Sequence, residues 1–143
     1  LMKDLTDKGK YTIDSNIKNI FYGGYSSENE IYSSIKEFHE EYRYLIDPHT
    51  AVGYKVIKDY IKETGDMTHT ILLSTASPYK FPVPVLKAIK GSAPEDIDRA
   101  ILELNQYSGS QIPGPIEELN TLPERSETIL EISEIQKYII NRY

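Results

Sequence analysis

The 143-residue sequence contains no cysteine, no tryptophan and no long hydrophobic run. Without cysteine the chain has no disulfide, no thiolate nucleophile and no cysteine-based zinc site, and it is compatible with a reducing cytosol. No apolar stretch approaches the ~20 residues that a membrane-spanning helix needs, and no signal peptide is recognisable. These absences exclude disulfide-stapled scaffolds and favour a cytoplasmic protein with no membrane partner.

The sequence also lacks common motifs of phosphate binding and catalysis. It has no glycine-rich loop of the P-loop or Rossmann type and no Gly-x-Ser-x-Gly elbow. A Ser–His–acid hydrolase whose nucleophile is not on such an elbow stays open as an alternative. The spacing of His39, His49 and His69 is not that of a helical metal-binding pair, so no metal site is expected. His39 lies beside two glutamates and is expected to be a solvated surface residue. The formal net charge of −6 disfavours nucleic acid as a partner.

The composition that remains is typical of a globular domain. Hydrophobic residues make up 39% of the chain and charged residues 27%, which is too apolar for a disordered protein. A chain of this length forms one domain and buries roughly two-thirds of its unfolded surface. Residues 1–12 are charged and aperiodic, so we expect them to form a loose lead-in.

Apolar residues at helical spacing, with local start and stop signals, predict six or seven helices. The pattern places them near residues 15–22, 28–42, 48–64, 82–90, 92–108, 116–119 and 133–140. Ser27 with Glu30 predicts a capping box for the second of these helices, and Ser133 with Gln136 predicts one for the last.

Two short segments have the composition of β-strands. Thr70–Leu73, a run of β-branched and aliphatic residues, predicts a buried strand, and Thr128–Ile132 alternates enough to predict an edge strand. A lone buried strand cannot satisfy its backbone hydrogen bonds. Either the two segments pair, or chain outside this sequence completes the sheet, and we favour the second alternative. The predicted fold class is α/β, mostly helical, with one or two strands.

The stretch Thr70–Phe81 is the first candidate site. The predicted strand runs into hydroxyl side chains at Ser74, Thr75 and Ser77, and Lys80 adds an ammonium group. In open α/β sheets, ligands bind beyond the carboxyl ends of the strands. The loop therefore suits a small polar or phosphorylated ligand, although an ordinary turn between a strand and a helix has the same pattern.

A second polar corner is predicted at the start of the helix that follows Ile46. Asp47 can accept hydrogen bonds from the first N–H groups of this helix, and Pro48 suits its first turn. His49 and Thr50 add an imidazole and a hydroxyl where anions also dock. The simpler alternative is that Asp47 caps the helix and His49 is exposed.

Both corners resemble motifs of the threonine synthase family. Residues 44–54 contain the segment Y-L-I-D-P-H-T-A-V-G, which matches the family in full. Residues 73–81, L-S-T-A-S-P-Y-K-F, resemble the family's L-S-T-A-H-P-A-K-F. The helix start Ser26–Glu28 and the L-P-E-R segment at residues 122–125 also fit, so the resemblance covers nearly the whole chain.

The resemblance implies a pyridoxal-phosphate enzyme of the tryptophan-synthase β type (fold type II), which converts O-phospho-L-homoserine and water to L-threonine and phosphate. It also implies that residues 1–143 are a single C-terminal fragment. In the family, the lysine that forms the Schiff base and the loop that holds the cofactor phosphate belong to N-terminal motifs, and neither motif occurs here. The fragment alone is expected to be inactive and to bind the cofactor weakly or not at all.

By this resemblance, Thr75 corresponds to the hydroxyl residue that contacts the pyridine nitrogen of the cofactor, with Ser74 beside it. Ser77 replaces a common histidine and Tyr79 a common alanine, which leaves the role of that histidine open. The remaining candidates for the lining of the pocket are Asp47, His49, Thr50 and Lys80.

Two alternatives to threonine synthase stay open at this point. One is another pyridoxal-phosphate enzyme that carries out β- or γ-replacement on a phosphorylated or acylated amino acid. The other is a helical module that binds a partner and is not catalytic. In either case, apolar faces that chain outside this sequence would cover are expected to promote self-association.

Overall fold

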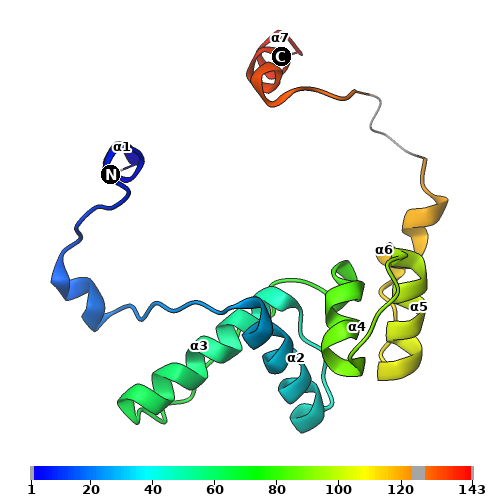
Figure 1. The fold of residues 1–143 in the computed structure, drawn as a ribbon, viewed down its shortest axis with the longest axis horizontal. Coiled ribbons are helices and arrows are strands. Elements are labelled where there is room, and N and C mark those ends of the chain that lie inside the picture. Colours follow the sequence, from blue (N-terminus) through cyan, green and yellow to red (C-terminus); the bar gives the residue numbers. More distant parts are fainter. Residues whose placement is uncertain (1, 124–127, 143) are drawn as a thin grey trace. The chain divides into compact units, whose positions relative to one another are not determined.

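The computed structural model describes residues 2–123 and 128–142, and these are mostly helical (Figure 1). The chain divides into two compact units, residues 1–112 and 113–143, which are described separately. Among the described residues, no helix combines the length and the apolar character needed to cross a membrane.

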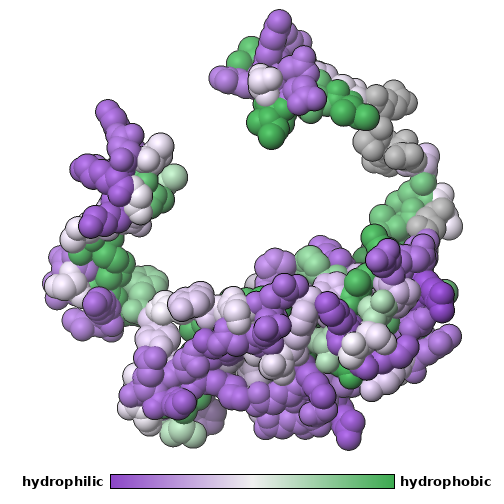
Figure 2. Space-filling view, in the orientation of Figure 1, coloured by the Kyte–Doolittle hydropathy of each residue, from purple (hydrophilic) through white to green (hydrophobic). Residues whose placement is uncertain are grey.

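The first unit begins with short elements that bury little surface. Helix α1 (Met2–Lys8) falls in the segment for which a loose lead-in was expected, and it has no buried residue. The 3-10 helix η1 (Ser15–Asn19) is capped by Asp14, whose side chain accepts from the N–H of Asn16 at 2.9 Å. Apolar side chains near η1, such as Phe21, face solvent. Figure 2 shows hydrophobic surface in this part of the chain.

Helices α2 (Glu28–Tyr42) and α3 (Pro48–Thr64) have the start signals that the sequence predicts. The N–H of Ser27 donates to Glu30 Oε2 at 2.7 Å, and the N–H of Glu30 donates to Ser27 Oγ at 3.4 Å, which confirms the first capping box. Helix α3 ends at Gly65, whose φ of 70° is a left-handed conformation that favours glycine.

Four helices form the core of the first unit (Figure 1). Helix α2 packs against both α3 and α4 (Pro82–Lys90), and α4 also packs against α5 (Ile97–Ser108). Helix α5 begins later than predicted, because Asp96 and not Ser92 caps it, accepting from the N–H of Arg99 at 2.8 Å. The buried hydrophobic residues that these contacts enclose include Ile35, Ile46, Ala51, Val85, Leu86, Ala100 and Leu104.

The prediction that His39 is a solvated surface residue is wrong. His39 is half-buried, and its Nδ1 atom has no hydrogen-bond partner among the described residues. It lies four residues after the fully buried Ile35, so both side chains share one face of α2. Burial disfavours the charged imidazole and lowers the pKa of His39.

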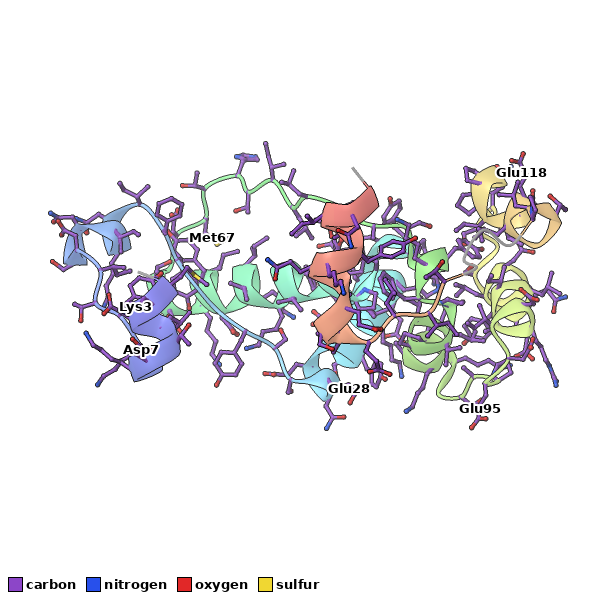
Figure 3. The ribbon with its side chains drawn as sticks, turned by 90° about the horizontal axis from the view of Figure 1, so that it is seen from above. Lys3, Asp7, Glu28, Met67, Glu95 and Glu118 are labelled. Carbon is purple, nitrogen blue, oxygen red and sulfur yellow. The ribbon has the colours of Figure 1, made fainter. Side chains whose placement is uncertain are left out.

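Neither predicted strand is formed among the described residues. Residues 66–77 between α3 and the 3-10 helix η2 (Pro78–Lys80) have no helix or ladder, as Figure 3 shows around Met67. Ile71 and Leu73 are 86% and 72% exposed, whereas Leu72 between them is half-buried. The alternation is that of an extended chain, but a strand also needs a partner, and none lies beside this segment in the part described.

The second unit, residues 113–143, holds short helical elements. Helix α6 (Gly114–Glu117) continues into η3 (Glu118–Thr121), which confirms helical structure near residues 116–119. Residues 128–131 are not a strand and lead into η4 (Ile132–Glu134) and α7 (Ile135–Arg142).

The last two residues of the L-P-E-R segment, Glu124 and Arg125, lie outside the described residues of this unit. The capping box near residue 133 is shifted by two positions, because Glu131 and Glu134 form it in place of Ser133 and Gln136.

Candidate functional site

The segment between α3 and α4 carries most of the predicted site residues. Ser74 and Thr75 are exposed at the end of its extended part, and Lys80 is exposed at the end of η2. The side chain of Ser77 caps η2 by accepting from the N–H of Tyr79 at 3.2 Å. Proline after Ser77 suits this first helical turn.

Leu72 joins the extended segment to the side of α3. A Cβ atom placed on Gly53, which lies in the second turn of α3, would be 2.9 Å from Leu72 Cδ1. The absence of a side chain at residue 53 therefore allows Leu72 to pack directly against the helix backbone. This contact brings the chain toward Thr75 alongside the N-terminal half of α3.

The two predicted polar corners meet through Thr50. The N–H of Thr75 donates to Thr50 Oγ1 at 3.2 Å, and the hydroxyl of Thr50 donates to Asp47 Oδ2. Asp47 is 0% exposed and Thr50 is 2% exposed, so the bond between them is shielded from water, whereas Thr75 is exposed. The structure thus places the start of α3 next to the loop that contains Thr75.

Asp47 also caps α3, as the sequence predicts. Its Oδ1 atom accepts from the N–H of His49 at 2.9 Å and from the N–H of Thr50 at 3.4 Å. Burial by itself raises the pKa of this carboxyl group, but the hydrogen bonds from Thr50 and His49 outweigh it and hold the pKa of Asp47 below its ordinary value. Asp47 is therefore an ionised carboxylate at neutral pH.

The side chain of His49 is 65% exposed, as expected from the alternative in which Asp47 caps the helix and His49 faces solvent. Its Nδ1 atom lies 3.1 Å from Asp47 Oδ1, and its ring lies 5.1 Å from the ring of Phe81. One edge of the imidazole is thus held by the buried carboxylate. His49 lies on the same side of the first unit as the loop that ends at Phe81.

Sequence reasoning missed the residue that anchors this loop from its other side. Tyr79 is buried, and its hydroxyl donates to the carbonyl of Ser110 at 2.8 Å. The same carbonyl accepts from Asn105 Nδ2 at 2.7 Å, so Tyr79 connects the loop to the end of α5. The available signal was a large aromatic side chain where the related family commonly has alanine.

A comparison with protein families identifies the chain. A family model described as "Threonine synthase, C-terminal" matches residues 50–139. The chain belongs to this family. The matched range contains Thr50, the loop of Thr75 and Lys80, and it begins just after Asp47 and His49.

Curated relatives agree with this assignment. The chain is 30% identical over 118 residues to Threonine synthase-like 1 of Homo sapiens, covering 82% of the chain and 14% of that protein. It is 35% identical over 79 residues to threonine synthase of Schizosaccharomyces pombe, covering 54% of the chain and 15% of that enzyme. With threonine synthase of Corynebacterium glutamicum the identity is 37% over 79 residues, covering 55% and 16%. The chain thus spans about one-seventh of the length of these relatives.

The residues present fit one side of a pyridoxal phosphate site. Thr75 is bonded to described residues only through its backbone N–H, so its exposed hydroxyl is available to a ring nitrogen. Ser74, the preceding residue, is also exposed. Among the described residues, no cluster of histidine and acidic side chains could hold a metal ion.

Proposed function

We propose that this chain is the C-terminal part of a cytoplasmic threonine synthase, which uses pyridoxal phosphate to convert O-phospho-L-homoserine and water to L-threonine and phosphate. The family match over residues 50–139 carries the proposal. The position of Thr75, exposed and tied by its backbone to Thr50, supports it. In the whole enzyme we expect fold type II, with the extended segment 70–75 lying against chain outside this sequence.

Thr75 contributes a neutral hydrogen bond to this chemistry. Pyridoxal phosphate supplies an electron sink for bond cleavage at the substrate carbon atoms. A carboxylate beside the pyridine nitrogen would keep the ring protonated and maximise its withdrawal of electrons from the substrate. A hydroxyl donates a hydrogen bond without holding a full positive charge on the ring, which suits elimination and replacement reactions. We expect Ser74, Lys80 and the turn of residues 47–50 to lie around the same pocket, with Asp47 and Thr50 buried beneath its surface.

The isolated chain should not retain the cofactor. The lysine motif that forms the Schiff base in this family does not occur in the sequence. A single hydrogen bond contributes only ~1 kcal/mol net, which is far too little to hold a cofactor. Titration of the chain with pyridoxal phosphate, followed by absorbance, should therefore show no tight binding with imine formation. Tight imine-forming binding would contradict the proposal.

The role of Thr75 is tested in the full-length enzyme. Thr75→Val should lower threonine formation by about 5- to 150-fold, since leaving a buried acceptor such as the ring nitrogen unpaired costs about 1–3 kcal/mol. Thr75→Ser keeps the hydroxyl and should retain most of the activity. Thr68→Val, an exposed threonine of the same segment, is the matched control. Undiminished turnover by Thr75→Val would refute the assignment.

The same assay separates threonine synthase from the alternative replacement reaction. Full-length enzyme is supplied with O-phosphohomoserine or with O-phosphoserine under the same conditions. We expect threonine and phosphate from the first substrate and little reaction with the second. Preference for O-phosphoserine would favour the alternative pyridoxal-phosphate enzyme.

A further inference from the structure

We propose that Thr50 is a positioning residue, which works with Asp47 to fix the backbone at Thr75 and so the direction of the Thr75 hydroxyl. This inference deepens the proposed function and rests on it for the identity of the ligand. The geometry on which it depends, a hydrogen bond from Thr75 N–H to Thr50 Oγ1 at 3.2 Å, belongs to the chain itself.

The polarity of the link follows from the chemistry of Asp47. An ionised carboxylate can only accept hydrogen bonds, and a threonine hydroxyl has a single proton. The hydroxyl of Thr50 donates that proton in a hydrogen bond to the buried Asp47, which leaves the lone pairs of Thr50 Oγ1 to accept from the N–H of Thr75. Thr50 therefore has one arrangement in which both neighbours are satisfied.

The surroundings of Thr75 show why this link matters. The preceding residues 70–73 have no ladder or helix in the described part of the chain, and Ile71 and Leu73 are exposed. In the described part of the chain, the packing of Leu72 on Gly53 and the bond from Thr75 to Thr50 tie the end of this segment to α3. Segments with few such contacts open locally at low cost. Misplacement of a reacting or hydrogen-bonding group by about 1 Å can cost on the order of 100-fold in rate.

A capping role alone is the competing explanation, because Asp47 and Thr50 both lie at the start of α3. A cap affects the first amides of the helix. A positioning role affects the amide of Thr75, which is 25 residues away in sequence. The two explanations therefore differ in which backbone amides a substitution of Thr50 affects.

Amide hydrogen exchange of the 143-residue chain, measured residue by residue with NMR, distinguishes them. Thr50→Val keeps the shape of the side chain and removes the acceptor, so the amide of Thr75 should exchange roughly fivefold faster, the factor that one net hydrogen bond represents. Thr50→Ser restores the acceptor and should restore slow exchange. Thr64→Val is the matched control, because Thr64 in the same helix accepts from the N–H of Asp66 at 3.1 Å.

Each outcome decides the inference. Faster exchange at Thr75 in Thr50→Val, with rescue in Thr50→Ser and no effect of Thr64→Val at Thr75, supports a positioning role. Unchanged exchange at Thr75, or no rescue by serine, overturns it. Because this measurement needs no cofactor, it is independent of the proposed function. If the exchange result holds but neither Thr50→Val nor Thr75→Val alters threonine formation by the full-length enzyme, the assignment of Thr75 to the cofactor fails and the structural link stands. If the full-length enzyme forms no threonine at all, the proposed function fails.

Discussion

Asp47 is a buried carboxylate whose described contacts are hydrogen-bond donors. Thr50 donates to one oxygen, and the backbone of His49 and Thr50 donates to the other. These bonds hold the pKa of Asp47 below its ordinary value, so the ionised form stabilises the folded state. That stabilisation is complete above about pH 4, the pKa of an aspartate in an unfolded chain, and is lost as the pH falls through the lower folded pKa.

Asp47→Asn should therefore destabilise the chain in a pH-dependent way. We expect a loss of about 1–3 kcal/mol at pH 7, since the amide cannot accept from Thr50 and from both backbone N–H groups at once. The difference from the parent chain should shrink as the pH falls below about 4 and Asp47 becomes protonated. Urea unfolding at several pH values measures both effects.

Asp96→Asn is the control for this prediction. Asp96 also caps a helix, but it is exposed. Its side chain accepts a hydrogen bond from the N–H of Arg99. Asparagine caps helices about as well as aspartate. A loss for Asp96→Asn as large as that for Asp47→Asn would show that capping, and not the buried link, accounts for the effect.

Local signals at single residues were sufficient to predict the caps but not the long-range contacts. Ser27, Glu30 and Asp47 satisfy groups within three residues of themselves, so their roles can be predicted from spacing. The bond from Tyr79 to Ser110 spans 31 residues and depends on how α5 packs. The burial of His39 likewise depends on which face of α2 its neighbours cover.

At the scale of elements, the docking of residues 70–75 on α3 is set by Gly53 and Leu72. Gly53→Ala alone should change stability little, because the gain in helix propensity of about 1 kcal/mol is offset by displacement of Leu72. In a Leu72→Ala background the clash is gone, and the same substitution should stabilise by about 1 kcal/mol. Urea unfolding of the four chains of this double-mutant cycle gives the coupling energy. Equal effects of Gly53→Ala in both backgrounds would contradict the docking.

Helices were predicted better than strands for a physical reason. The helices α3 and α4 satisfy their own backbone groups and end at Gly65 and Gly91, so their signals are local. A strand satisfies its backbone hydrogen bonds only through a neighbouring strand, and local sequence does not identify that neighbour. Thr70–Leu73 has the composition of a strand and is extended, but composition alone cannot provide the partner.

At the scale of the whole molecule, we propose that the exposed apolar residues of the extended segment promote self-association. Ile71 and Leu73 lie on one side of the segment with their backbone unpaired in the described part of the chain. Such a segment can pair with a copy of itself. Sedimentation velocity should show concentration-dependent association of the parent chain and a marked decrease for the double variant Ile71→Ser and Leu73→Ser.

Helix α5 offers a matched control for this experiment. Ile97 and Leu102 are also exposed apolar residues, but they lie on a helix whose backbone is already satisfied. Replacing both with serine should leave the association unchanged. If this control reduces association as much as the substitutions at Ile71 and Leu73, general surface hydrophobicity and not the extended segment is responsible.

The link from Asp47 through Thr50 to Thr75 also restricts how the protein can evolve. Position 50 needs a hydroxyl, because no apolar or carboxylate side chain both donates to Asp47 and accepts from the N–H of Thr75. Serine keeps the donor and the acceptor on one atom and therefore preserves both bonds in place. A lineage that loses the hydroxyl leaves a buried carboxylate short of a donor, and the neutral path through such a change begins with replacement of Asp47. Apart from the exchange of threonine and serine at position 50, positions 47 and 50 are thus expected to change together.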